Sequence, residues 1–500
     1  MAIRVFNAMC AGNFIKSAIF VVNFGNLQDM EQARDTSFKI AVISDLHVMA
    51  PELLVKDGNA FEQYLSRDRK MLRESVEILD TLVTDIIDLK PHLVLVTGDL
   101  TKDGERASHL LVANQLQRLV DAGIQVLIVP GNHDINNPDA KVYDGDTATA
   151  TDTISRQDFA EIYRNMGYDE QSRRDNDTLS YCRDVTDSLT ILAIDACMDR
   201  LNTFVSHGDA RDHCKTSGSL EPESQQWLVD QAEAATAAGK RVVAMMHHHL
   251  VPHFHMEDTL AAPYMVDRAG QLRKRLAQAG VHVIFTGHLH ISDICQTSMR
   301  GGNMVEVATA SAVGYPCQWR VATCNTAAGK MQLRSITLHS LPSQPDFGER
   351  AREVFKKCIP TMTNGVLTRY WPEISQAIDN LQIKHPFLMR FIDIPDTPEE
   401  IATLLLKHLQ EPVTQTYIAF AEGNEGGSDN KQLINQLIKG IDKVVNQTVR
   451  GTLKPFVKLA FRLRIYKTFK LVLRSILEDL NDISTSHETV INDHTAIINL

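Results

Sequence analysis

From Phe38 onward, the hydrophobic and polar positions follow two different patterns. Short, continuous apolar runs bounded by turn residues predict buried strands, and longer segments with apolar residues every three or four positions predict helices. These segments alternate along the first half of the chain, which predicts an α/β domain. The predicted strands there are FKIAVIS, HLVLVT, QVLIVP, SLTILAID, RVVAMM and VHVIFT. The later runs NMVEVATA, RVATC and MQLRSITL predict further strands that pair antiparallel.

A change of pattern near residue 341 divides the chain. The segment 341–349, LPSQPDFGE, contains two prolines and a glycine and predicts a linker. Beyond it most segments have a helical period, so we expect an all-helical second domain over 345–500. The first domain is expected over 36–340, after a poorly structured leader over 1–35. Within it, the polar residues 136–180 predict an insertion that forms a lid or rim.

The composition narrows the class of protein. The chain of 500 residues has a net charge of −11 and a sequence pI of about 5.9, which argues against general nucleic-acid binding. Hydrophobic residues make up 44% and charged residues 23%, as in ordinary globular proteins, and the length favours two domains. No apolar run approaches the length of a transmembrane helix. The oligomeric state stays open.

The cysteines and the leader bear on the compartment. Eight cysteines are scattered without a CxxC pair, which favours free thiols in a reducing compartment, although an even number would permit disulfides after export. The apolar run AIFVV in the leader is shorter than the core of a signal peptide. We therefore expect a cytoplasmic protein, or an exported one if residues 1–35 are a degraded or mis-started export signal.

A basic stretch lies in the second domain. Residues 450–474 contain eight lysines and arginines, no acidic residue, and apolar residues between them. Such an amphipathic helix can contact an anionic membrane surface or a partner. We favour the alternative, a bundle helix whose basic face is solvated.

Residues able to bind metals follow each of five predicted strands in the first domain. Ligands bind beyond the carboxyl ends of strands in open α/β sheets, so we expect these residues to converge. In extended chain, residues two apart point to the same side, which would pair Asp45 with His47 and His288 with His290. The glycines at 98, 131 and 287 let the backbone approach a bound ion. The residues in question are Asp45, His47, Asp99, Asn132, His133, Asp134, His247, His288 and His290.

The donor types indicate the kind of ion. Carboxylates, one amide and several imidazoles suit Mn, Fe, Zn or Co better than Ca or Mg. There are too many donors for one ion of four to six ligands. Two ions that share a bridging carboxylate are therefore expected.

The order of these motifs resembles the calcineurin-like metallophosphoesterase superfamily. The matching segments are SDLH, VTGDLTKDGE, VPGNHD, MMHHH and FTGHLH, and the resemblance extends over about residues 38–340. Within the superfamily the chain is most similar to the bacterial cyclic-nucleotide-phosphodiesterase-like branch with a C-terminal helical domain. The resemblance implies a β-sandwich flanked by helices. It also implies a first metal held by Asp45, His47 and His290, a bridging Asp99, and a second metal held by Asn132, His247 and His288.

The implied chemistry is hydrolysis of a phosphodiester, with a 3′,5′-cyclic nucleotide as one candidate. His133 would give a proton to the leaving oxygen, and Asp134 would hydrogen-bond His133 and fix its tautomer; a helix N-cap is the other interpretation of Asp134. His253, His255 and Tyr315 are further candidates for substrate contacts, with ordinary packing as the alternative. The rival functions are a phosphomonoesterase, nucleotidase or glycerophosphodiesterase on the same metal core, and an inactive scaffold.

Overall fold

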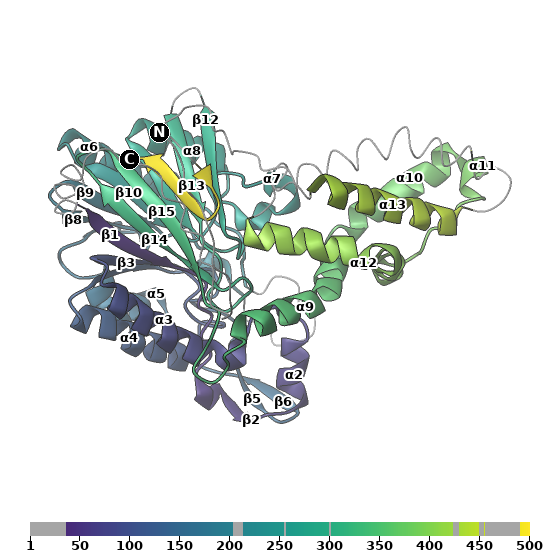
Figure 1. Cartoon of the computed structure of the whole chain (residues 1–500), viewed down its shortest axis with the longest axis horizontal. Coiled ribbons are helices and arrows are strands. Elements are labelled where there is room, and N and C mark those ends of the chain that lie inside the picture. The colour runs from purple at the N-terminus through teal and green to yellow at the C-terminus, as the bar shows by residue number, and fades with distance from the viewer. Residues whose placement is uncertain are drawn as a thin grey trace, which may run out of the picture.

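The computed structural model describes residues 37–203, 214–254, 257–299, 302–423, 430–449, 455 and 491–500. Two seven-stranded sheets form a sandwich with helices on its outer faces, and a helical arm projects from one end (Figure 1). This is the architecture that the resemblance implies. The leader over 1–35, and the basic stretch 450–474 apart from Pro455, lie outside the described residues.

Each sheet contains both parallel and antiparallel pairs, and the parallel pairs lie at one edge of the first sheet and in the middle of the second. In the first sheet β1, β3 and β4 are parallel, and in the second β9, β10, β11 and β13 are parallel. The first sheet runs β16 (Ile491–Asn492), β17 (Thr495–Asn499), β15 (Lys330–Thr337), β14 (Gln318–Asn325), β1 (Phe38–Ile43), β3 (Leu93–Thr97), β4 (Gln125–Val129). The second runs β12 (Asp293–Met299), β13 (Gly302–Ala308), β11 (Val281–Thr286), β10 (Arg241–Met246), β9 (Leu189–Ile194), β8 (Tyr181–Thr186), β7 (Arg173–Arg174).

The antiparallel expectation for the last three strands is correct for two of them. β14 and β15 pair antiparallel, but β13 pairs parallel with β11 and antiparallel only with β12. The hydrophobic pattern of β13 could not distinguish these arrangements, because a strand buried on both faces has a similar composition in either one.

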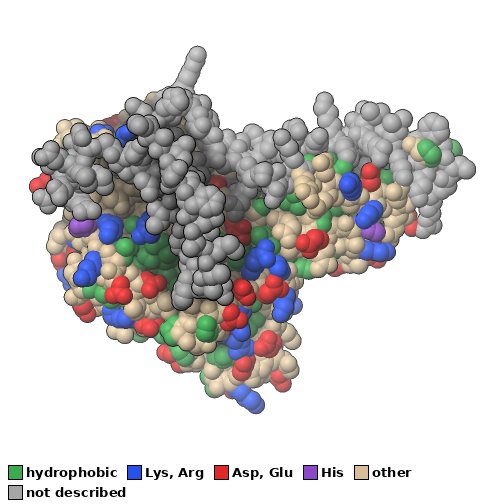
Figure 2. Space-filling model, viewed as in Figure 1, with side chains coloured by type: hydrophobic (Ala, Val, Ile, Leu, Met, Phe, Trp, Pro, Cys, Tyr) green, Lys and Arg blue, Asp and Glu red, His purple; other side chains and the backbone are tan. Residues whose placement is uncertain are grey.

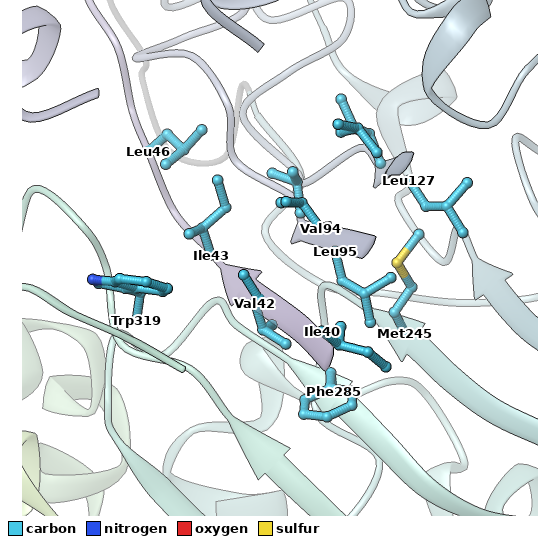
Figure 3. Packing of buried hydrophobic residues seen from close by; sticks show 14 of the residues in the cluster. Ile40, Val42, Ile43, Leu46, Val94, Leu95, Leu127, Met245, Phe285 and Trp319 are labelled. Atoms are coloured by element: carbon cyan, nitrogen blue, oxygen red, sulfur yellow. The ribbon is translucent and has the colours of Figure 1, made fainter. Parts of the chain in front are cut away.

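The main core lies between the two sheets. Ile40 and Val42 of β1 lie in the same cluster as Met245 of β10 and Phe285 of β11, and all four are fully buried (Figure 3). Continuous apolar strands are expected here because both faces of each central strand are covered. This packing brings the carboxyl ends of β1, β3 and β4 close to those of β10 and β11.

Helices cover the outer faces of both sheets. α3 and α4 connect the parallel strands of the first sheet, and α6 and α8 pack on the second. Their buried apolar residues recur at helical spacing, as on α3, where Leu79, Leu82 and Val83 are buried. The bounds are α3 (Ser75–Leu89), α4 (Arg106–Asp121), α5 (Arg156–Ile162), α6 (Pro222–Ala237), α7 (Glu257–Leu260) and α8 (Ala269–Gln278).

Part of the polar insertion at 136–180 builds a small third sheet. Its order is β2 (Leu54–Lys56), β5 (Lys141–Asp144), β6 (Thr147–Ala150). α2 (Asn59–Leu65) packs on this sheet through Phe61 and Tyr64, which contact Tyr143. The expected rim is therefore formed jointly by this insertion and by residues 54–65.

The helical arm contains the five remaining α-helices of the described residues. They are α9 (Phe347–Arg369), α10 (Trp371–Lys384), α11 (Pro386–Met389), α12 (Pro398–Glu422) and α13 (Asn430–Thr448). No helix in the described ranges is both long enough and apolar enough to cross a membrane. One boundary differs from expectation: residues 491–499 do not belong to a helical domain, since β17 pairs with β15 at the edge of the first sheet.

The return of the C-terminus is fixed by a buried cation. Arg320 of β14 is fully buried and donates to the carbonyl oxygens of Ala308 (2.8 Å) and Asp493 (2.7 Å). The short strands around His494 gave too weak a pattern for a sequence-based prediction. The catalytic sandwich therefore includes residues from both ends of the described chain.

Candidate metal centre and active site

Donor atoms from five loops meet at the carboxyl edge of the sandwich. One group consists of Asp45, His47, Asp99 and His290, and a second of Asp99, His247 and His288; within each group the donor atoms lie within 4.8 Å of one another. Asn132 joins the second group, because its Oδ1 lies 3.2 Å from His247 Nε2. Asp99 belongs to both groups, as a bridging ligand must. We call these seven residues the dinuclear site.

The local backbone of this site is unusual. A positive φ in a residue other than glycine is uncommon and costs about 1–3 kcal/mol. Such strain persists where the surrounding structure imposes it, commonly at functional sites. The extended geometry we expected for the Asp45/His47 and His288/His290 pairs is therefore wrong, although the pairs do converge. The ligands with positive φ are Asp45 (51°), His47 (38°), Asp99 (50°), His288 (71°) and His290 (61°).

Two glycines allow the loops to approach one another this closely. A Cβ on Gly131 would overlap the carboxylate of Asp99, and a Cβ on Gly287 would overlap Ser44 and the carboxylate of Asp45. Any larger residue would push a ligand away from the site. Glycine thus permits a close approach of the backbone to the ligand side chains at these positions, and its approach to a bound ion stays a prediction.

The geometry of the imidazoles fits two bound cations. His47 Nε2 and His290 Nε2 face each other at 3.1 Å, and His290 Nε2 lies 3.1 Å from Asp45 Oδ1. Two facing imidazole nitrogens can share one proton at most, whereas a cation between them accepts a lone pair from each. His247 Nε2 lies 3.3 Å from Asp99 Oδ2, at the second position. Mixed oxygen and nitrogen donors of this kind suit transition metals.

Backbone carbonyls orient the ligands of the second position. His247 Nδ1 donates to the carbonyl oxygen of Thr97 at 2.9 Å, which leaves Nε2 free as a donor atom. His288 Nε2 donates to the carbonyl oxygen of Pro263 at 3.3 Å, which leaves Nδ1 free. Such outer contacts fix the ring and its tautomer at metal sites.

The charges of the site are strongly coupled. Burial acts to raise the pKa of Asp99, but the nearby imidazoles of His247 and His133 hold it well below its usual value. Burial, with the positive charge of Lys70, holds the pKa of His47 well below its usual value. For Asp99 and His47 these are the states that bind a metal, an ionised carboxylate and a neutral imidazole, whereas Asp99 raises the pKa of His247 to about 9 against the effect of burial.

His133 lies beside the dinuclear site without being one of its ligands. Its backbone N–H donates to Asp99 Oδ1 at 2.9 Å, and its ring stands edge-on to that of His47. Its Nδ1 contacts the carbonyl oxygen of Lys102 (2.8 Å) and Asp103 Oδ1 (2.9 Å). Nδ1 therefore carries a hydrogen, and Nε2 remains for exchange with a substrate. Burial acts to lower the pKa of His133, but Asp99 and Asp103 raise it above its usual value.

Asp134 does not orient His133, so this expectation is wrong. Its carboxylate accepts from the backbone N–H of Gly131 (2.8 Å) and Thr101 (3.0 Å) and from the Thr101 hydroxyl. It caps no helix in the described structure either. The side chain turns back beneath its own loop, because three donors there satisfy it. Burial and the charge of Asp99 raise the pKa of Asp134 to about 7.

His253 lies in a second buried cluster, not at the substrate pocket. His253 Nδ1 contacts Asp293 at 2.6 Å, and its Nε2 contacts Glu306 at 3.2 Å. His249 Nδ1 contacts Glu257 at 2.7 Å, and its Nε2 donates to the carbonyl oxygen of Gly287 at 2.9 Å. We call these five side chains the buried histidine network. Its hydrogen bonds occupy all four ring nitrogens, so His253 has no nitrogen left for a substrate.

The other candidates have mainly structural contacts. Tyr315 donates its hydroxyl hydrogen to Glu422 of α12 and stacks on Phe355 of α9, so it joins the sandwich to the arm. His248 is buried and contacts the carbonyl oxygen of Thr216 at 3.0 Å. His255 lies outside the described residues.

Two residues that line a cavity together with His133 were not predicted from the sequence. Asp103 follows Asp99 by four positions inside a motif that was recognised, but nothing in the pattern showed that it would turn toward His133. Lys70 belongs to the charged segment SRDRK after α2, which has the composition of a solvated loop. Its side chain is nevertheless only 8% exposed and pairs with Asp68.

The sandwich, together with a site that has places for two cations, is typical of metal-dependent hydrolases of phosphoesters. This is the class of protein that the structure indicates. Residues 38–292 match the family model of the calcineurin-like phosphoesterases. The chain belongs to the calcineurin-like phosphoesterase family. No match to a curated protein is found.

Solved structures with related folds include three at low sequence identity. A dimetal phosphatase from Danio rerio is 16% identical with a TM-score of 0.42, over 60% of this chain and 96% of its own. The sulfate thiohydrolase SoxB from Thermus thermophilus is 15% identical with a TM-score of 0.31, over 64% and 60%. A phosphopantetheinyl hydrolase from Mycobacterium tuberculosis is 13% identical with a TM-score of 0.26, over 55% and 90%.

Proposed function

We propose that the chain is a dinuclear metal-dependent phosphodiesterase, with 3′,5′-cyclic nucleotides among its candidate substrates. The observation that carries the proposal is the position of His133 between the dinuclear site and an open cavity of about 500 Å³. An alkoxide leaving group needs a proton, and a histidine with one nitrogen anchored and the other free can supply it.

The charge of the cavity supports a diester rather than a monoester. Lys70 is paired with Asp68 at 3.2 Å, and the charged residues that line the cavity are the cations Arg67, Lys70 and Lys141 and the acids Asp68, Asp103 and Asp139. This balance is better suited to the single negative charge of a diester than to the double charge of a monoester. The membership of the family is compatible with either substrate, because the metal centre contacts only the phosphoryl group.

The metal positions and His133 would carry out different parts of the reaction. When bound, two divalent ions supply neutralisation of the phosphoryl charge and activation of water at neutral pH. Asp99 holds the two positions together, since it belongs to both donor groups. Asp103 fixes the ring of His133, and His133 gives its Nε2 proton to the leaving oxygen.

The test is a substrate panel on protein stripped of metal and then loaded separately with Mn, Zn, Fe or Co. The panel contains bis-p-nitrophenyl phosphate, p-nitrophenyl phosphate, 3′,5′-cyclic AMP and glycerophosphocholine. We expect activity to return with metal and to be higher on the diesters. A clear preference for p-nitrophenyl phosphate would replace the proposal with a phosphomonoesterase, and no turnover with any metal would favour the inactive scaffold.

A further inference from the structure

The cavity beside His133 is lined by a buried cation, Lys70. Lys70 and His133 both line it, and the backbone of Lys70 is fixed by a bridge to Gly314. The ammonium group of Lys70 contacts Asp68 Oδ2 at 3.2 Å, and the backbone N–H of Lys70 donates to Asp68 Oδ1 at 2.9 Å. Asp68 therefore fixes the lysine at both ends, which limits the conformations of a usually flexible side chain.

The charge of Lys70 faces the same cavity as the proton donor His133. Both residues line that cavity, and Asp68 keeps the ammonium group of Lys70 in place there. A substrate whose leaving oxygen faces His133 would also present that oxygen to Lys70.

The rest of the cavity provides room for the group attached to that oxygen. Tyr64 and Tyr143 line its wall, and the hydroxyl of Tyr64 donates to Asp103 at 3.3 Å. Lys102 is buried behind the wall, 4.4 Å from the centre of the Tyr64 ring. Lys141 lies at the cavity on β5. A wall of tyrosines and charged hydrogen-bonding groups suits a hydroxylated organic group such as a sugar.

We propose that Lys70 stabilises the leaving oxygen together with His133, and that this cavity binds the leaving alcohol. The inference rests on the proposed phosphodiesterase function and narrows its substrate class to diesters with an unactivated, hydroxyl-bearing alcohol. Lys70 is not a metal ligand. Its role is electrostatic, as the developing negative charge on oxygen is greatest when the leaving group is an alkoxide.

The step is balanced as follows. The oxygen of water forms a bond to phosphorus, and the bond from phosphorus to the leaving oxygen breaks with its electron pair on that oxygen. His133 transfers its Nε2 proton to this oxygen, and the alcohol departs. Water loses one proton to solvent and His133 regains one from solvent. A linear diester therefore gives a phosphomonoester and an alcohol, and a cyclic diester gives a single phosphomonoester that carries the new hydroxyl group.

The experiment compares two diesters whose leaving groups differ in how strongly the developing negative charge on oxygen must be stabilised. Bis-p-nitrophenyl phosphate has an activated aryl leaving group, and the second substrate is 3′,5′-cyclic AMP or glycerophosphocholine, whichever the wild-type enzyme hydrolyses faster. Lys70→Met removes the charge and keeps most of the apolar stem, Lys70→Arg keeps the charge, and Lys56→Ala on the exposed strand β2 is the control. Metal content and thermal melting are measured for each variant.

Lys70→Met should lower kcat/KM on the unactivated diester by roughly 100-fold and on the aryl diester by less than about 10-fold. Lys70→Arg should recover most of the loss, Lys56→Ala should stay within about two-fold on both substrates, and all variants should keep their metal. An equal loss on both diesters, or a loss of metal, would overturn the role of Lys70. A wild-type enzyme that hydrolyses only the aryl diester, or only monoesters, would overturn the substrate class.

Discussion

Two clusters of histidines and carboxylates lie side by side in the sandwich, and they differ in how their ring nitrogens are used. In the dinuclear site, His47 Nε2 and His290 Nε2 face each other at 3.1 Å. In the buried histidine network, both nitrogens of His253 face carboxylates, at 2.6 Å and 3.2 Å. Both clusters bring donor atoms together, since those of His249, His253 and Glu306 also lie within 4.8 Å of one another.

The difference teaches that convergence of donors is not sufficient to define a metal site. In the buried histidine network every proton has an acceptor, so no cation is required to hold the rings together. In the dinuclear site the Nε2 atoms of His47 and His290 face each other, and Nδ1 of each ring has no hydrogen-bond partner among the described residues, which leaves a place for a cation between the Nε2 atoms. Backbone strain separates the clusters as well, because five ligands of the dinuclear site have positive φ and none of the five network residues does.

The largest effect should come from the residue shared by both metal positions. Asp99→Ala removes a donor from each group, so bound metal should fall below two ions per chain and kcat/KM should drop by on the order of 1000-fold or more. Metal analysis of the purified protein and the substrate panel measure the two effects. Asp121→Ala, at the exposed end of α4, is the matched control and should leave both unchanged. Full metal content in Asp99→Ala would contradict the bridging role.

The second test addresses the buried histidine network. His253→Ala leaves Asp293 and Glu306 without their shared partner, so the free energy of unfolding should fall by about 3–5 kcal/mol. The number of bound metal ions should stay the same as in the wild-type protein. Denaturant unfolding and metal analysis provide the readouts, with the partly exposed His282→Ala as control. A loss of one metal ion per chain would show that this network is a third metal site, and the distinction drawn above would fail.

The sequence could predict which strands end at the site but not how the loops are turned. Apolar runs such as the one before Asp45 identify a buried strand, and the residue after its end is then fixed at the sheet edge. Whether a loop side chain points inward depends on local donors, as with Asp134, which turns toward Thr101 and Gly131 instead of His133. Sequence spacing does not contain this information.

The same limit explains the residues that were missed or misplaced. Lys70 is buried by a bridge to Gly314, more than two hundred positions away, which no local pattern can indicate. The C-terminal strand β17 is short and pairs with β15 across the whole helical arm. Hydrophobic periodicity predicts elements well, while long-range pairing depends on the assembled fold.

The third prediction concerns the carboxylate that orients His133. Asp103→Asn removes a negative charge that raises the pKa of His133, so kcat should fall by roughly 10–100-fold with metal content unchanged. His133 must be protonated to act as an acid, and activity is lost as the pH rises through its pKa. Because the substitution lowers this pKa, the loss should begin at a lower pH than in the wild-type enzyme. A pH–rate profile of both proteins measures the shift, and an unmoved basic limb would argue against His133 as the acid.

The smallest effect is expected at Tyr315, which lies between the sandwich and the arm. The question is whether its hydroxyl makes a structural contact or a contact with the substrate. Tyr315→Phe keeps the stacking on Phe355 but removes the hydrogen bond to Glu422, so the free energy of unfolding should fall by about 1 kcal/mol. The value of KM should not change, because the hydroxyl is directed at α12 and not at the cavity beside His133. Thermal melting and steady-state kinetics on the preferred diester are the measurements. An increase in KM without a change in melting temperature would assign the hydroxyl to the substrate, and it would place the C-terminal end of α12 at the wall of the active site.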